Sequence, residues 1–148
     1  MTIESMMIPK VAVNAFVVHK GQVLLCLRHS APPAWTVPGG HMHSGETLED
    51  ATRRELKEET GVEVDELRVI AVCNDVNTTD NTHYVNFFLL GQYCAGTVVN
   101  GEPEDIDRIE WYPIQNLPRP LFFNIRRLLA KISLNELITL REPLVCDL

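Results

Sequence analysis

Apolar runs alternate with short polar breaks along the chain, and their spacing predicts most of its elements. Two β-rich runs, residues 10–20 and 22–28, meet at a Lys-Gly turn and predict a hairpin. Residues 29–40 hold three prolines and two glycines, which predict a loop. Later apolar runs predict three more strands, over residues 66–76, 83–93 and 108–114.

Helical spacing of apolar positions occurs in two segments. Residues 46–60 have this period and end before Gly61, a residue type that commonly stops a helix. Ser44 or Thr47 is expected to cap the start of this helix. The second helical segment is an amphipathic helix over 122–132. The remaining segments are a loop over 95–105 with room for one short strand, and an unassigned apolar tail over 133–148.

Strands on both sides of one long helix predict an α/β (α+β) fold, a mixed sheet covered by helices on its faces. The 148 residues show no repeats or linkers, so we expect a single domain over 1–148. Apolar residues make up 45% and charged residues 22%, as in ordinary globular proteins. No apolar run approaches the ~20 residues of a membrane span, and the N-terminus lacks signal-peptide features. We therefore expect a cytoplasmic location and no membrane partner.

The net charge of −7 and the absence of a basic patch argue against a partner that is a long nucleic acid. An acidic protein still binds small phosphates when divalent cations mediate the contact. The four cysteines are scattered without a C-x-x-C pair, which argues against a zinc knuckle or a redox motif. A small phosphorylated ligand therefore remains open.

The helix predicted over 46–60 places negative charge on its apolar face. At about 100° per residue, Glu55 and Glu59 lie about 20° from Leu48, the centre of that face, and Glu58 lies about 80° away. Like charges on one patch repel, and burying an unpaired carboxylate costs several kcal/mol. Such an oxygen cluster suits Mg²⁺ or Mn²⁺. The alternative is an exposed acidic face whose charges are solvated.

The same segment resembles the Nudix box, G-x5-E-x7-R-E-U-x-E-E-x-G-U, in which U is an aliphatic residue. All nine specified positions match: Gly40, Glu46, Arg54, Glu55, Leu56, Glu58, Glu59, Gly61 and Val62. The flanking order, with WTVPGG before the helix and IEWYPI after the later strands, is also similar to Nudix hydrolases. The resemblance implies a Nudix-type α/β/α sandwich with the box helix packed on a mixed sheet.

The resemblance also implies an enzyme, a pyrophosphohydrolase that uses Mg²⁺ or Mn²⁺ to cleave a nucleoside diphosphate linked to a group X. The catalytic residues that it implies are Arg54, Glu55, Glu58 and Glu59, and the metal ligands are Glu55, Glu58, Glu59 and the Gly39 carbonyl. Glu55 is either a metal ligand or the general base. Arg54 is expected to orient the glutamates and to pair with Glu46, while Gly61 is structural.

Members of this family often take a further acid from a loop outside the box. The segment NGEPEDID offers Glu102, Glu104, Asp105 and Asp107. We favour Glu104 as a metal ligand, because EPE before a Trp-containing strand resembles one group of nucleotide triphosphatases. The alternative is an acidic surface loop.

The chain looks most like MutT-type nucleoside triphosphate diphosphatases, which would release a (d)NMP and pyrophosphate. Substrate contacts are expected from Arg28, Gly40, His41, His83 and Tyr84. The alternatives are a nucleotide-sugar or ADP-ribose pyrophosphatase and, in another class, a non-catalytic domain that senses a nucleotide. A homodimer is implied by the resemblance only.

Overall fold

The computed structural model of the protein describes residues 8–77 and 80–148. Its elements, in chain order, are β1 (Lys10–His19), β2 (Gln22–Arg28), β3 (Ala34–Thr36), β4 (Gly39–His41), α1 (Leu48–Thr60), β5 (Glu63–Asn77), β6 (Thr82–Ala95), β7 (Ile106–Pro113), α2 (Phe123–Lys131), α3 (Leu134–Leu137) and β8 (Leu144–Asp147). Within the described ranges, no helix has both the length and the apolar character that a membrane crossing requires.

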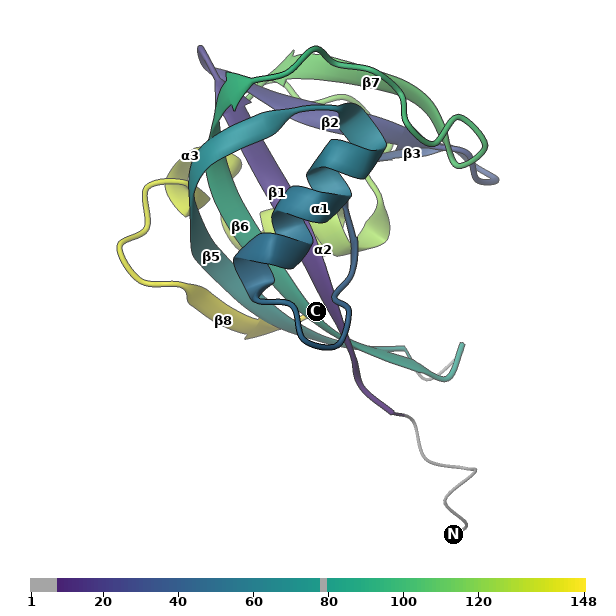
Figure 1. Cartoon of the computed structure of the whole chain (residues 1–148). Helices are drawn as coiled ribbons and strands as arrows, with labels where there is room; N and C mark the ends of the chain where they lie inside the picture. The colour runs from purple at the N-terminus through teal and green to yellow at the C-terminus, as the bar shows by residue number, and fades with distance from the viewer. Residues whose placement is uncertain (1–7, 78–79) are drawn as a thin grey trace, which may run out of the picture.

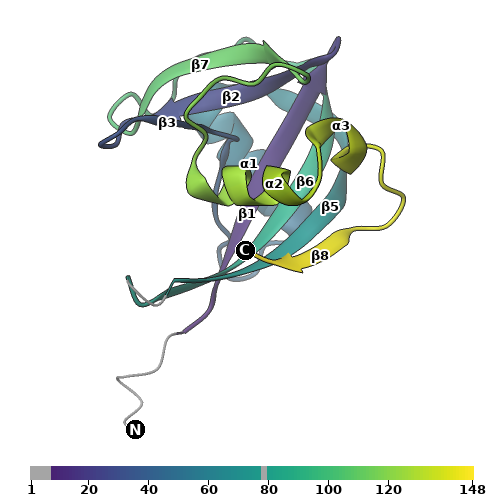
Figure 2. The same cartoon turned by 180° about the vertical axis from the view of Figure 1, so that it is seen from behind.

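All eight strands belong to one mixed sheet, in the order β3-β2-β1-β6-β5-β8, with β4 beside β1 and β7 beside β2. Strand β1 runs parallel to β6 and antiparallel to β4, so that Asn14 lies opposite both Phe88 and Gly39. Helix α1 crosses one face of this sheet (Figure 1), and α2 and α3 lie on the other face (Figure 2). The predicted α/β/α sandwich with a mixed sheet is confirmed.

Helix α1 begins and ends through local chemistry. The Thr47 side chain caps it by accepting the backbone N–H three residues later at 3.0 Å, so the helix starts after Thr47 and not at residue 46. Gly61 ends it with φ 74°, a left-handed conformation that glycine adopts without steric cost. Ala51 and Leu56 are fully buried, and they hold the helix on the sheet.

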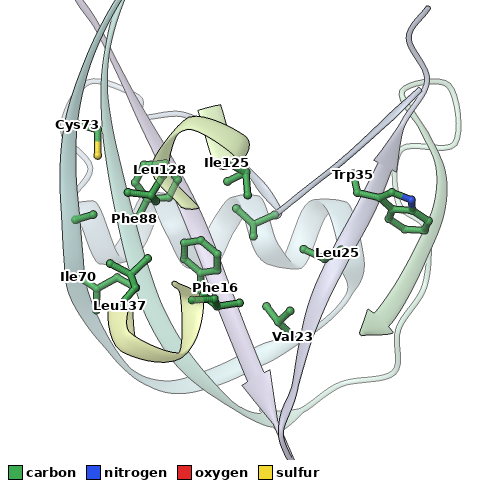
Figure 3. Close-up of a cluster of buried hydrophobic side chains, with 13 residues drawn as sticks. Phe16, Val23, Leu25, Trp35, Ile70, Cys73, Phe88, Ile125, Leu128 and Leu137 are labelled. Carbon is green, nitrogen blue, oxygen red and sulfur yellow. The ribbon is translucent and has the colours of Figure 1, made fainter. Parts of the chain in front are cut away.

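The larger part of the core lies between the sheet and α2. Figure 3 shows Phe16 and Phe88 on the strands, with Ile125 and Leu128 of α2 over them. The two phenylalanine rings lie 5.8 Å apart between centroids. Full burial of each such side chain contributes roughly 1.5–3 kcal/mol. This packing fixes α2, and with it the residues at its N-terminus, against the sheet.

Two segments differ from the sequence prediction. Residues 29–40, predicted as a loop, contain β3, which pairs with β2, and β4, which pairs with β1. The unassigned tail forms α3 and β8, and β8 extends the sheet beside β5. Strands of three or four residues are too short to give a periodic pattern, so pairing with a neighbour decides their conformation. In residues 96–105, which the structure describes throughout, no strand forms.

Candidate functional site

Glu59 is a buried carboxylate in the last turn of α1. Its exposed fraction is 5%, and its Oε2 accepts a hydrogen bond from the Gly39 backbone N–H at 2.9 Å. This N–H belongs to strand β4. Gly39 pairs with Asn14 of β1, and its backbone lies very close to the backbone of that strand. A Cβ at Gly39 would lie 2.2 Å from the Val13 carbonyl oxygen, so only glycine fits there. The Gly39–Gly40 backbone therefore lies against the acidic face of α1.

The surroundings of Glu59 disfavour its charge. Burial raises the pKa of Glu59 to about 8, against the lowering effect of the Gly39 hydrogen bond. The neighbouring carboxylates of Glu55 and Glu102 add to the rise, and Arg28 opposes it. The site therefore has more negative charge than its own cations balance.

Arg54 ties the other glutamates together. Its Nε and Nη2 donate to the two carboxylate oxygens of Glu46 at 2.7 and 3.0 Å, a bidentate pair. Its Nη1 donates to Glu55 at 2.9 Å and to Glu58 at 3.3 Å, and Nη2 also reaches the His41 carbonyl at 3.0 Å. The contacts implied for Arg54 are present, and its role in turnover stays a prediction.

Glu46 holds the chain that leads into α1. Besides Arg54, it accepts the His43 backbone N–H at 2.7 Å. The Arg54 hydrogen bonds, followed by the His43 bond, lower the pKa of Glu46 to about 2. Glu46 therefore stays ionised at neutral pH and fixes the segment around His43, which leads into α1, to the helix.

A segment that precedes β7 covers the end of α1 and adds an acid to the site. The Gly101 N–H donates to the Glu59 carbonyl at 3.0 Å, and a Cβ at Gly101 would lie 1.8 Å from the Glu58 carbonyl oxygen. This contact places the next residue, Glu102, near the helix acids. Burial, and then Glu55, raise the pKa of Glu102, whereas Glu104 is exposed. The structure therefore favours Glu102 over the predicted Glu104 as the acid outside the box.

A cavity of about 250 Å³ adjoins β4. Four of the five predicted substrate contacts line it, namely Arg28, Gly40, His41 and Tyr84. The His41 and Tyr84 rings stack, with centroids 5.5 Å apart. The structure does not bring His83 to this cavity. His83 lies opposite Val76, on the face of β6 away from Tyr84, where its ring contacts Asn74.

Sequence reasoning missed several buried polar residues that line the cavity. Among them are Asn14, Asp75, Asn86 and Asn124. Buried strands read as apolar runs, so a polar residue inside such a run is a signal that could have found Asn14 and Asn86, whereas Asp75 follows Asn74 and does not interrupt an apolar run. The fourth, Asn124, lies in α2 just after the aromatic pair Phe122 and Phe123, which also line the cavity.

The site residues fit a divalent cation by their chemistry. Across residues 8–77 and 80–148, no three His, Cys, Asp or Glu side chains are already arranged around a common metal position. The glutamates nevertheless offer carboxylate oxygens, the donors that Mg²⁺ and Mn²⁺ prefer. A cation would neutralise the carboxylates of Glu55 and Glu102, whose charges add to the rise that burial causes in the pKa of Glu59. Glu58, whose side chain is 51% exposed, accepts from Arg54 at 3.3 Å and lies at the solvent side of this group.

Comparison with known proteins gives consistent matches. The NUDIX domain family matches residues 8–132. An oxidized purine nucleoside triphosphate hydrolase of Danio rerio is 33% identical over 74% of this chain and 69% of its own length. An ADP-ribose pyrophosphatase of Methanocaldococcus jannaschii is 28% identical over 77% of this chain and 68% of its own.

The fold also has solved counterparts. A MutT NUDIX hydrolase from Burkholderia pseudomallei superposes with a TM-score of 0.78 at 28% identity, over 85% of this chain and 99% of that one. The chain spans less than half the length of several other relatives that it matches. Family and fold agree, while the names of the relatives point to more than one kind of substrate.

Proposed function

The chain belongs to the Nudix hydrolase family, and from this premise we propose that it hydrolyses a nucleoside triphosphate to a nucleoside monophosphate and pyrophosphate. The observation that carries the proposal is the buried carboxylate of Glu59, bonded to Gly39 and crowded by Glu55 and Glu102. An excess of negative charge beside a cavity lined by Arg28 is suited to an anionic substrate only when cations join the two.

Divalent cations are expected to be held by Glu55, Glu58 and Glu59, with the Gly39 carbonyl and Glu102 as further oxygen donors. When bound, such a cation lowers the pKa of water and neutralises charge on the phosphates. We propose Glu102 rather than Glu104 as a further oxygen donor. Burial and neighbouring acids raise the pKa of Glu102, whereas Glu104 is exposed to solvent.

The chain's own residues orient the reaction. In the alternative in which Glu55 is the general base, its Oε1 accepts from Arg54 and its Oε2 takes a proton from water. The oxygen of that water forms a bond to the α-phosphorus. The bond between the α- and β-phosphates breaks, and pyrophosphate leaves. Arg54 holds Glu55 and Glu58 in place, and Arg28 faces the phosphates from the cavity wall. Fixed geometry of this kind supplies much of the rate in phosphoryl transfer.

A second candidate, an ADP-ribose pyrophosphatase, is favoured by one observation, the similarity to the methanogen enzyme of that name. The triphosphate reading is preferred because the chain is 33% identical to the Danio rerio oxidized purine nucleoside triphosphate hydrolase, against 28% for the methanogen enzyme.

A substrate panel tests the proposal. The protein is incubated with Mg²⁺ and, separately, with each common NTP and dNTP, ADP-ribose, a dinucleotide and nucleotide sugars, and pyrophosphate, phosphate and nucleotide products are resolved. We expect monophosphate and pyrophosphate from triphosphates. Cleavage of ADP-ribose or sugar nucleotides alone would favour the second candidate, and no turnover of any compound would favour a nucleotide sensor.

A further inference from the structure

Three buried polar side chains lie in a row across neighbouring strands, on the face of the sheet that α2 covers. They lie on adjacent strands, Asp75 on β5, Asn86 on β6 and Asn14 on β1, and retain exposures of 3, 4 and 7%. The β5–β6 register pairs Cys73 with Asn86 and Asp75 with Tyr84. Side chains alternate along a strand, so these four point to the same side. Figure 3 shows Cys73 on that side of the sheet.

One oxygen of the buried Asp75 carboxylate, Oδ1, lacks a hydrogen-bond donor anywhere in the described part of the chain. The Arg127 guanidinium comes no closer than 3.9 Å, and its side chain is 49% exposed. A buried acceptor without a donor is costly, and native proteins rarely keep one without a reason. Because Asp75 lines the cavity, a ligand can supply the missing N–H groups.

The neighbours of Asp75 define what else the ligand carries. Asn14 Nδ2 donates to Asn86 Oδ1 at 3.3 Å, so the Asn86 amide offers its N–H₂ end to a ligand carbonyl. The aromatic side chains of Tyr84, Phe122 and Phe123 line the same cavity. Flat aromatic walls are suited to stacking against a planar heterocycle.

The position of Asp75 separates it from the phosphate end. Gly39 and Gly40 lie on β4, and two strands, β1 and β6, stand between β4 and β5. Three strand spacings make about 14 Å along the sheet. Arg28 and Gly40 line the cavity on the side of the acidic helix, whereas Asp75 would repel a phosphate. The base of a nucleotide therefore belongs at Asp75.

We propose that the cavity selects a guanine base, with Asp75 as the residue that determines the preference. A carboxylate has two adjacent acceptors, which match the N1–H and the 2-amino group of guanine, and Asn86 donates to the C6 carbonyl. Adenine and cytosine would turn a ring-nitrogen lone pair toward the carboxylate, and uracil and thymine carry one N–H between two carbonyls. The inference deepens the proposed function and rests on it for the nature of the nucleotide.

The test measures binding rather than turnover. Affinities for GMP, IMP and AMP are determined by calorimetry without divalent cation, for the wild type, Asp75→Asn and Asp65→Asn. Asp65 is an exposed residue of the same strand, so this control removes the same charge from β5. We expect GMP to bind roughly tenfold to a hundredfold more tightly than AMP, IMP to lie between them, and Asp75→Asn to abolish the preference while Asp65→Asn keeps it.

Folding is checked by thermal melting. Asp75→Asn replaces a buried carboxylate by an uncharged isostere, so its melting temperature should equal or exceed that of the wild type. Equal affinities for GMP and AMP in the wild type, or an unchanged ratio in a folded Asp75→Asn, would overturn the inference. A GMP preference in a protein that hydrolyses no triphosphate would support the base assignment and overturn the proposed function instead.

Discussion

The Gly39 backbone N–H donates to Glu59 Oε2 at 2.9 Å, and this bond joins β4 to the last turn of α1. It holds a carboxylate in one position inside the protein, and it opposes without cancelling the rise in the pKa of Glu59 that burial causes. Since β4 also lines the cavity, the same strand links the acidic helix to the space where a substrate is expected.

The first prediction concerns pH and the stability of the protein without divalent cation. Glu59 has an ordinary pKa of 4.5 and a folded pKa of about 8, so it binds protons more tightly in the folded state. Its contribution to stability is fully present below about pH 4.5 and is lost as the pH rises through 8, by on the order of several kcal/mol. Urea melts of the wild type and Glu59→Gln across this range check it. The stability of Glu59→Gln relative to the wild type should increase as the pH rises. A difference in stability that does not change with pH would contradict the assignment.

The second prediction separates two acids of one loop. Glu102→Gln should lower kcat by about a hundredfold or more, because it removes an oxygen donor beside Glu55 and Glu59. Glu104→Gln removes an exposed charge and should leave kcat within about twofold. Steady-state kinetics of the pair decide the question. The reverse order of effects would restore Glu104 as the acid outside the box.

The third prediction concerns the guanidinium of Arg54. An ammonium cannot reproduce its bidentate pair with Glu46 together with the bonds to Glu55 and Glu58. Arg54→Lys should therefore reduce kcat by about a hundredfold, the size expected when reacting groups are misplaced by about 1 Å. Arg53→Lys is the matched control, since Arg53 donates to the Val64 carbonyl outside the site. Equal rates for both variants would show that positioning by Arg54 is unimportant.

The fourth prediction concerns the segment that covers the end of α1. In Gly101→Ala the new methyl group would lie 1.8 Å from the Glu58 carbonyl oxygen, so the segment must move and carry Glu102 away. Both melting temperature and kcat should fall. Gly21→Ala, in the β1–β2 turn at φ 75° with open space around it, should cost about 1 kcal/mol of stability and no activity. If Gly101→Ala retains full activity, the segment does not position Glu102.

Local chemistry made much of this fold and site predictable from the sequence. The helix wheel placed Glu55 and Glu59 on the inner face; the Glu55 side chain is 12% exposed, and Glu59 as a whole residue is 5% exposed. Gly61 stops the helix as its residue type suggests.

Long-range contacts set the rest. The choice between Glu102 and Glu104 depends on how Gly101 meets the end of α1, and no spacing along the chain records that contact. The cavity likewise forms only when Asn14, Asp75 and Asn86, which are distant in sequence, meet through the order of strands β1, β6 and β5.

Binding of Mn²⁺ tests the central claim, that the carboxylates of α1 hold a divalent cation, most directly. Free Mn²⁺ is followed by electron paramagnetic resonance during titration of the wild type, Glu59→Gln and Glu104→Gln at one pH above 8, with turnover measured on the same samples. We expect the wild type and Glu104→Gln to bind Mn²⁺ and hydrolyse substrate, and a folded Glu59→Gln to bind at least about tenfold more weakly and to lose turnover by orders of magnitude. Equal Mn²⁺ affinity and near-normal turnover in Glu59→Gln would contradict the account.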